Sequence, residues 1–315
     1  MLHFSFNLSL GHCHNVSKTM ETAKFIKAEE ELLCLSLTER SASTRKNYLT
    51  AINSLKRFSS ESGLQIMDNN SMLNYQKWLL QEGKNRNTAS CYIRSLRSLY
   101  NMLYPEKAHP FADVFTGCTK TEKRAVPVDC MMRFVNFPPP LSSEHRLWYD
   151  IFMFSVLGMG IPFVDLAHLS KNNIHENILK YERRKTSQLI TVPIVFEMRG
   201  ILERYEGRTS NGKLFPLFET EEPSYSEYQN ILARYNRGLR KLSQKYNLPC
   251  MLTSYVARHT WASLANASGV NLKHISQALG HSSVKTTEIY LACLSSSVLQ
   301  RDSLLVAKML YGRHT

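Results

Sequence analysis

The chain has 315 residues, 43% of them hydrophobic and 21% charged, an ordinary globular composition that suffices for about two domains of roughly 100–200 residues each. Its 39 Lys and Arg against 26 Asp and Glu give a net charge of +13, which indicates a polyanionic partner, either nucleic acid or an acidic membrane face. The seven cysteines include no CxxC pair, and no apolar run reaches the ~18 residues of a membrane span. We therefore expect a cytoplasmic protein without a disulfide framework, metal site, cofactor or membrane segment.

Hydrophobic periodicity predicts four helices in the first part of the chain, after a loose N-terminal tail over 1–20. The second helix is expected to be capped by Ser43 or Thr44 and to end at Gly63. Short loops between four helices favour a compact bundle, so we predict a helical N-terminal domain over 21–115. The four helices are expected at about 24–37, 43–62, 71–81 and 87–103.

The second part of the chain follows a basic, aperiodic stretch over 116–128, which we interpret as an interdomain linker. In the predicted second domain, 129–315, two β-prone runs around the polar turn Arg-Lys-Thr-Ser-Gln predict a hairpin over 178–194. The other apolar patterns are helical, so the predicted fold is mainly α with a small β-sheet. These helices are expected at about 143–157, 196–205, 226–246, 255–267, 272–279, 284–294 and 297–310.

Two stretches lack acidic residues altogether, 83–105 in the first predicted domain and 229–287 in the second. A solvated surface normally mixes charges of both signs, so these stretches predict contacts with phosphates. Two basic surfaces joined by a flexible linker suit a protein that binds around a DNA duplex. The candidate DNA-binding residues are Lys84, Arg86, Arg94, Arg97, Arg234, Arg237, Arg240 and Lys241.

Residues 254–294, SYVARHTWASLANASGVNLKHISQALGHSSVKTTEIYLACL, combine an arginine, a histidine and a tyrosine in one short span. This segment resembles the active-site half of the tyrosine recombinases, or phage-type integrases. The resemblance puts Arg258 on the family's second catalytic arginine, His281 on its third-box histidine and Tyr290 on its nucleophile. The YVARHTWA form is most similar to recombinases of Bacteroides-type mobile elements. The family also has a helical core-binding domain, which 24–105 resembles.

The hairpin segment KYERRKTSQLITVPI resembles the family's lysine-bearing hairpin, which makes Lys185 the fourth candidate catalytic residue. The chemistry needs these residue types, because a phenol can attack an anionic phosphodiester only when the developing charge is neutralised. Arg258 offers a bidentate fork to a non-bridging oxygen, and His281 offers a further hydrogen bond. Lys185 can protonate the departing 5′ oxygen, which leaves a 3′-phosphotyrosyl link that needs neither ATP nor metal for religation.

The sequence departs from the family pattern at two places. Tyr255 stands where the family often has histidine, and LGMGIPFVDLAHL puts Met159 at the position of the first arginine. Methionine gives only a weak sulfur acceptor, so either catalysis is weakened or another cation supplies the charge, with Arg146 as a candidate. The resemblance gives Asp165 a supporting role through hydrogen bonds.

Three functions remain open from the sequence. The first is a site-specific DNA recombinase for integration, excision or inversion, and the second is a type IB-like enzyme that nicks and reseals DNA as a monomer. The third is a recombinase-derived DNA-binding protein with impaired catalysis. The apolar helix expected over 297–310 favours a homotetramer on double-stranded DNA, because such helices commonly dock on a neighbouring protomer in recombinases. Accessory DNA-bending proteins are the other partners we consider.

Overall fold

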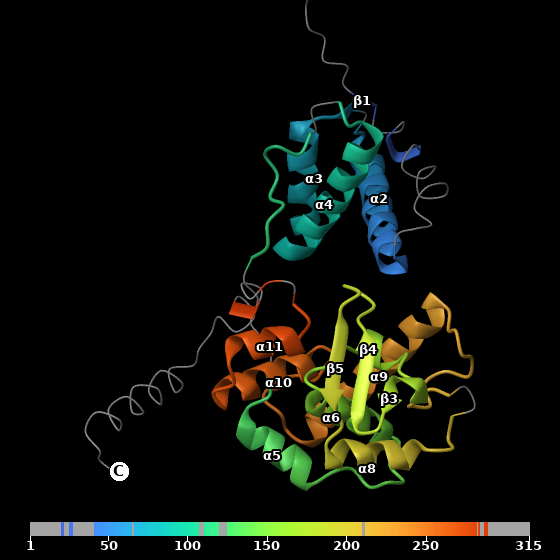
Figure 1. Cartoon of the computed structure of the whole chain (residues 1–315). Coiled ribbons are helices and arrows are strands. Elements are labelled where there is room, and N and C mark those ends of the chain that lie inside the picture. The colour runs from blue at the N-terminus through green and yellow to red at the C-terminus, as the bar shows by residue number, and fades with distance from the viewer. Residues whose placement is uncertain are drawn as a thin grey trace, which may run out of the picture. The chain divides into compact units, whose positions relative to one another are not determined.

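The computed structural model divides into two compact units, residues 1–121 and 122–315 (Figure 1). None of the helices it describes is long and apolar enough to cross a membrane. Both units are mainly helical, and a small sheet lies in the second, which confirms the predicted fold class. The structure describes residues 20–21, 25–27, 41–64, 66–106, 110–119, 125–209, 212–281, 283 and 287–288.

Unit 1 is built on three helices, α2 (Ala42–Ser62), α3 (Asn69–Gln81) and α4 (Arg86–Leu103). The short strands β1 (Met20–Glu21) and β2 (Ile66–Met67) pair antiparallel beside them. Of the predicted helix over 24–37, only residues 25–27 are described, and these are helical.

The helices of unit 1 begin at side-chain caps. Asp68 and Asn85 accept the backbone N–H groups of Ser71 and Thr88, at 2.7 and 2.8 Å. The cap predicted at Ser43 or Thr44 is wrong, because the Ser41 hydroxyl accepts the N–H of Thr44 and both predicted residues lie inside α2.

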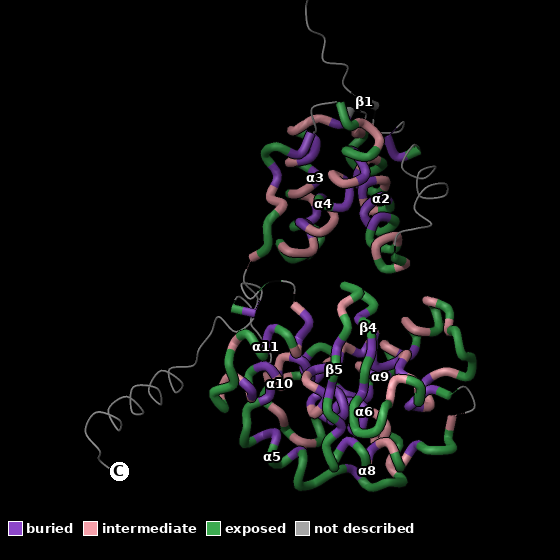
Figure 2. The backbone as a smooth tube through the Cα atoms, in the orientation of Figure 1, coloured by how far each residue is buried: buried purple, intermediate pink, exposed green. Residues whose placement is uncertain are grey.

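The core of unit 1 collects one apolar stripe from each helix (Figure 2). The stripe predicted on the second helix is buried in α2 as expected. The beginning of the predicted linker is attached to this unit. Oδ1 of Asn87 on α4 accepts the backbone N–H of Thr119 at 2.7 Å, and its Nδ2 donates to the Thr119 carbonyl at 3.0 Å. The buried stripes are Tyr48, Ile52, Leu55 and Phe58 of α2, Met72, Tyr75 and Leu79 of α3, and Ile93, Leu96 and Leu99 of α4.

Unit 2 packs seven helices that the structure describes with a three-stranded sheet. The predicted helices over 143–157, 196–205, 226–246, 255–267 and 272–279 are confirmed within a few residues, whereas the predicted helices over 284–294 and 297–310 lie almost entirely outside the described residues. The helices are α5 (Val128–Asn136), α6 (Arg146–Leu157), α7 (Phe163–Leu166), α8 (Phe196–Tyr205), α9 (Tyr225–Lys245), α10 (Val256–Ala267) and α11 (Leu272–Ala278).

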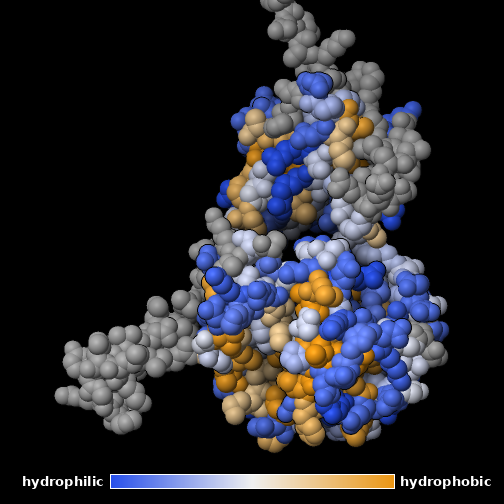
Figure 3. All heavy atoms as spheres, in the orientation of Figure 1, coloured by the Kyte–Doolittle hydropathy of each residue, from blue (hydrophilic) through white to orange (hydrophobic). Residues whose placement is uncertain are grey.

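The sheet has the order β3 (Ile174–His175), β4 (Ile178–Glu182) and β5 (Leu189–Pro193), with antiparallel neighbours. The β4–β5 pair is the predicted hairpin, with Tyr181 opposite Ile190. Burial alternates along both strands, so one face packs on the core and the other carries exposed side chains. On the face of unit 2 in Figure 3, hydrophobic side chains form a strip among hydrophilic ones.

Helix α6 runs through the middle of unit 2 and is buried along most of its length. Its first turn holds an ionic cluster around Asp150, whose side chain is fully buried. Arg146 donates from Nε to both carboxylate oxygens, at 3.1 and 3.0 Å. Arg204 of α8 donates from Nε and Nη2 at 3.0 and 2.9 Å, and the Tyr205 hydroxyl donates at 2.9 Å. The cluster fixes α8 against α6.

Asp150→Ala is expected to lower the free energy of unfolding of unit 2 by about 3–5 kcal/mol, because it removes the carboxylate that pairs with the partly buried guanidinium groups of Arg146 and Arg204. Urea unfolding followed by circular dichroism measures this loss. Glu61→Ala, which removes an exposed carboxylate bonded to Arg57 and Trp78 on unit 1, is the control and should lower the free energy of unfolding far less. Equal losses in the two variants would contradict the assigned importance of the cluster.

Candidate active site around Arg258

Arg258 lies in the first turn of α10 with 4% of its surface exposed, although it carries a full charge. Its Nη1 donates to the carbonyl oxygen of Gly160 at 3.2 Å, and its Nη2 donates to the carbonyl oxygen of Leu279. The same Nη2 lies 3.3 Å from Nε2 of His281. The fold therefore brings together Arg258 and His281, two of the residues that the sequence analysis singled out.

The turn between α6 and α7 forms one wall of this site. Gly160 has a φ of 73°, and a Cβ there would lie 2.8 Å from the Cα of Arg258, so only glycine allows the two backbones to approach this closely. Met159, at the predicted position of the first arginine, is half-buried with a φ of 61°, a conformation that costs a non-glycine residue about 1–2 kcal/mol. The turn, 158–162, contains no basic residue, so it contributes no cation to the site.

Arg146 does not lie near this turn. It is the first residue of α6, about one helix length away from the turn, and its Nη1 donates to the carbonyl of Pro139 at 2.7 Å while its Nε is bonded to Asp150. The suggestion that Arg146 supplies the missing charge is therefore wrong for this arrangement.

His281 follows α11 and is held on both ring nitrogens. Because an arginine can only donate, Nε2 must accept from Arg258, which leaves the proton on Nδ1 to bond the Thr287 hydroxyl at 2.8 Å. Burial, together with the charges of Arg258 and Arg183, lowers the pKa of His281 to about 4. His281 is thus neutral at pH 7 in the absence of DNA, and donation from Nε2 to a phosphate requires a change of tautomer or uptake of a proton.

This pKa predicts a pH dependence of stability. The unfolded histidine titrates near pH 6.5, so between about pH 6.5 and 4 the unfolded chain binds more protons and the contribution of His281 to stability falls as the pH is lowered. His281→Asn keeps a donor for Thr287 but does not titrate there. The midpoint of urea unfolding should therefore fall less between pH 7 and pH 5 for His281→Asn than for the wild type. Equal falls would contradict the assigned neutral state.

A second buried guanidinium, Arg183, was not singled out from the sequence. It follows β4 directly, is 8% exposed, and donates from Nη1 to the carbonyl oxygens of Leu279 and Gly280, both at 2.9 Å. The Leu279 carbonyl therefore accepts from Arg183 and Arg258 together. The strand period could have found it, because the inward positions 179 and 181 of β4 are followed at the same spacing by 183.

Asp165 of α7 lies beneath the hairpin, with its side chain fully buried. Its Oδ1 accepts the backbone N–H of Arg184 at 2.9 Å, and its Oδ2 is 3.6 Å from Nε of Arg183. Burial raises the pKa of Asp165, while the bond from Arg184 and the charge of Arg183 oppose that rise. Lys185, one residue further along the hairpin, is exposed.

The two tyrosines named in the sequence analysis differ in what can be said of them. Tyr255 precedes α10 with 53% of its surface exposed, and its ring lies edge-on to that of His259 at 4.8 Å. Tyr290 lies outside the described residues, and so does the apolar helix predicted over 297–310.

The candidate DNA-binding residues lie on two helices. On α4 and the loop before it, Lys84, Arg86 and Arg94 are exposed, and half-buried Arg97 donates to the Thr116 hydroxyl at 3.4 Å. On α9 the four candidates are all exposed, and Lys241 also pairs with Glu144 at 3.4 Å. These α9 residues are Arg234, Arg237, Arg240 and Lys241.

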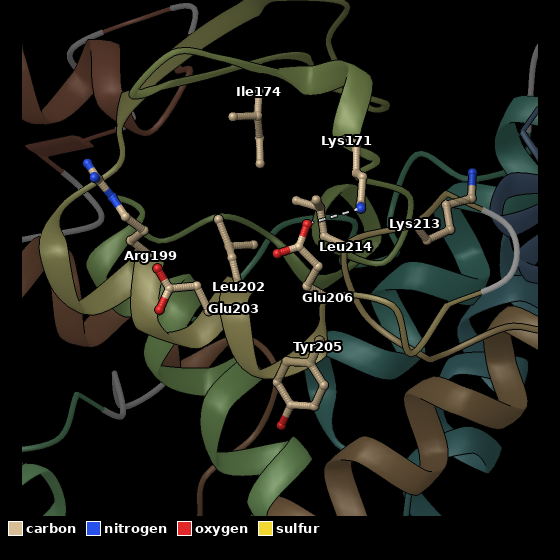
Figure 4. Close-up of a pocket in the computed structure, with 9 residues that line it drawn as sticks. All are labelled: Lys171, Ile174, Arg199, Leu202, Glu203, Tyr205, Glu206, Lys213 and Leu214. Atoms are coloured by element: carbon tan, nitrogen blue, oxygen red, sulfur yellow. Dashed lines mark hydrogen bonds and ion pairs between the residues drawn. The ribbon is translucent and has the colours of Figure 1, made fainter.

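Unit 2 also has a side pocket between α8 with the loop after it and the segment 171–174, where Lys171 and Glu206 pair at 3.4 Å (Figure 4). The Tyr205 hydroxyl points from its wall toward Asp150 instead of into the opening. The pocket shares no residue with the cluster around Arg258. The two are therefore separate sites, and the side chains of the cluster, not this pocket, are the candidate active site. The lining residues are Lys171, Ile174, Arg199, Leu202, Glu203, Tyr205, Glu206, Lys213 and Leu214.

Comparison with known protein families places the chain in a family. A model described as the phage integrase family matches residues 129–296, and a model of the phage integrase SAM-like domain matches 24–109. The chain belongs to the phage integrase family. The first match contains the whole cluster, and the second covers the helices of unit 1.

The chain is also similar to individual proteins. Tyrosine recombinase XerD of Halalkalibacterium halodurans is 22% identical over 230 residues, which is 70% of this chain and 75% of that protein. A lambda integrase dimer bound to a COC′ core site superposes with a TM-score of 0.67 and 16% identity, over 86% of this chain and 95% of that one. The Tn1549 transposon integrase in complex with transposon right-end DNA gives 0.63 and 15%, over 91% and 100%. These two structures share the fold of this chain.

Proposed function

We propose that the chain is a site-specific DNA recombinase that cuts and rejoins double-stranded DNA through a 3′-phosphotyrosyl intermediate. The observation that carries the proposal is the contact between buried Arg258 and half-buried His281 in a member of the phage integrase family. The YVARHTWA segment favours a recombinase of a Bacteroides-type mobile element, acting in integration, excision or inversion.

In this proposal Tyr290 attacks the scissile phosphate and Arg258 stabilises the charge that develops on its non-bridging oxygens. Arg258 suits that role because its guanidinium is held by two carbonyl groups before DNA arrives, so it needs little reorganisation during the reaction. His281 is the second donor once the phosphate is bound. An anionic phosphate beside the ring favours its protonated form and opposes the low pKa of His281 in the free protein.

Lys185 is the proposed general acid for the 5′ oxygen that leaves. Its exposed position near the tip of the β4–β5 hairpin lets it reach bound DNA, and Asp165 supports the base of that hairpin through the N–H of Arg184. Tyr255, where the family often has histidine, is exposed at the start of α10 and has a supporting role at most.

The basic faces of α4 and α9 are the proposed phosphate-binding surfaces, one in each unit. In unit 1, a strongly hydrophilic stripe runs between hydrophobic side chains in Figure 3. Recombination joins two duplexes, so we propose a homotetramer on DNA, assembled through the apolar residues near the C-terminus and aided by DNA-bending proteins.

One observation favours a second candidate, a recombinase-derived DNA-binding protein with impaired catalysis. The turn over 158–162, which includes Met159, carries no basic residue. A site with fewer cations stabilises the transition state less, and the loss of one such donor typically costs about 10²–10³ in rate. Binding without covalent chemistry is the expected behaviour of this alternative.

The two candidates are separated by a duplex from the flanks of the chain's own element, nicked beside the scissile phosphate so that the cut fragment diffuses away. A recombinase leaves a protein–DNA adduct that survives denaturation in detergent, and protease digestion should leave a peptide on the 3′ end. Binding to this duplex without any adduct would overturn the recombinase proposal and favour the DNA-binding candidate.

A further inference from the structure

The side chain of Arg183 joins two segments that both carry proposed catalytic groups. Its Nη1 holds the carbonyl oxygens of Leu279 and Gly280, the two residues immediately before His281. These bonds connect residues that are 96 and 97 positions apart in the chain. The turn before His281 is thereby fixed to the end of β4.

The backbone of Arg183 closes the hairpin turn that contains Lys185. Its N–H donates to the carbonyl of Gln188 at 2.9 Å, and its own carbonyl accepts the N–H groups of Thr186 and Ser187 at 3.2 and 2.8 Å. One residue therefore sets the shape of the turn through its backbone and the position of that turn through its side chain.

Close packing makes this connection rigid. Gly280 has a φ of 60°, and a Cβ there would lie 2.7 Å from Cδ of Arg183 and 3.0 Å from Cδ1 of Ile190 on β5. On the other side, Nε of Arg183 faces the buried carboxylate of Asp165 at 3.6 Å, and neither of these two atoms has a hydrogen-bond partner among the described residues. A purely structural contact here would favour an apolar side chain, which avoids the cost of burying a charge.

We propose that Arg183 is a positioning residue for strand cleavage, which aligns the hairpin carrying Lys185 with the turn carrying His281 so that both groups meet the same phosphate. The inference rests on the proposed recombinase function and deepens it. Arg183 acts chiefly through Lys185, because Arg258 also holds the Leu279 carbonyl in the turn before His281 when Arg183 is lost. Its loss leaves Lys185 intact but misplaced with respect to the leaving 5′ oxygen.

Arg183→Met tests the proposal in single-turnover cleavage of the nicked duplex at saturating protein, with binding and thermal unfolding measured alongside. A misplaced general acid should slow cleavage by about tenfold to a hundredfold without weakening DNA binding. The matched control is Arg184→Met, which removes the same charge from the next residue, whose side chain is exposed. Cleavage equally fast in Arg183→Met and in the control would overturn the proposal.

A second substrate separates positioning from general damage. With sulfur in place of the bridging 5′ oxygen, the leaving group is a thiol with a pKa near ~8.5, which departs without a general acid. On this substrate Lys185→Met should cleave as fast as the wild type. Most of the rate defect of Arg183→Met should disappear as well. An Arg183→Met defect of equal size on both substrates would overturn the proposal.

The double variant Arg183→Met, Lys185→Met completes the test on ordinary DNA. If Arg183 acts through Lys185, the double variant is no slower than Lys185→Met alone, and multiplicative defects would contradict the proposal. If Arg183→Met does not fold, Arg183→Lys, which keeps the charge, replaces it in the comparison of single and double variants. Absence of any wild-type adduct would contradict the recombinase function itself, whereas wild-type cleavage with multiplicative defects contradicts only the role of Arg183.

Discussion

Tyr290→Phe is expected to abolish the covalent protein–DNA adduct and to leave DNA binding unchanged. The substitution removes a single hydroxyl, and the phenyl ring keeps the volume and apolar character of the side chain. Since the phenolic oxygen is the proposed nucleophile, the variant lacks the atom that would bond the phosphate. Denaturing electrophoresis of labelled DNA measures the adduct, and filter binding measures the affinity.

The control for this experiment is Tyr255→Phe. Tyr255 is a second tyrosine near Arg258 in sequence, and its exposed ring lies against His259. We expect this variant to keep forming the adduct. An adduct from Tyr290→Phe that disappears in the double variant would transfer the role of nucleophile to Tyr255 and refute the assignment made from the resemblance.

Arg258→Ala is expected to slow cleavage at saturating DNA by about 10²–10³, the usual effect of losing one donor to a developing oxyanion. The buried guanidinium also bonds the carbonyls of Gly160 and Leu279, so the variant leaves two backbone acceptors without this donor. The free energy of unfolding should therefore fall as well, and cleavage must be measured at a temperature where circular dichroism shows a folded protein.

Two further variants make the Arg258 result interpretable. Arg258→Lys keeps the charge but loses the planar fork, so its cleavage rate should lie between those of the wild type and Arg258→Ala. Arg234→Ala removes an exposed arginine from α9 and should weaken DNA binding, most clearly at low salt, without slowing cleavage once the DNA is saturated. A folded Arg258→Ala protein that cleaves at the wild-type rate would refute the role of Arg258.

The elements of the fold were largely readable from the sequence where local signals agree. The helix expected over 196–205 has the bounds of α8, and the polar turn correctly predicted the β4–β5 hairpin. Helix α5 was missed because it is short, follows Pro127 and has no side-chain cap. Its stability comes from burying Cys130, Met131 and Phe134 against distant parts of unit 2, which no local pattern reveals.

The candidate site was readable only in part. The motif around Arg258 and His281 stands out because the two residues lie 23 positions apart in a short segment, and the structure brings them into contact. The contribution of Arg183 depends on carbonyl groups almost a hundred residues away, and a backbone carbonyl has no sequence signature. Arg146 was a wrong candidate because its real partner, Asp150, lies one helical turn further on and looks unremarkable in the sequence.

Every side chain of the cluster that the structure describes belongs to one compact unit, residues 122–315, whereas the basic helix α4 belongs to the other. Substitutions on the proposed phosphate-binding face of α4 therefore leave the bonds among Arg258, Arg183 and Leu279 in place. In evolutionary terms, the proposed DNA contacts of α4 can diverge while the proposed chemistry of the other unit is inherited intact.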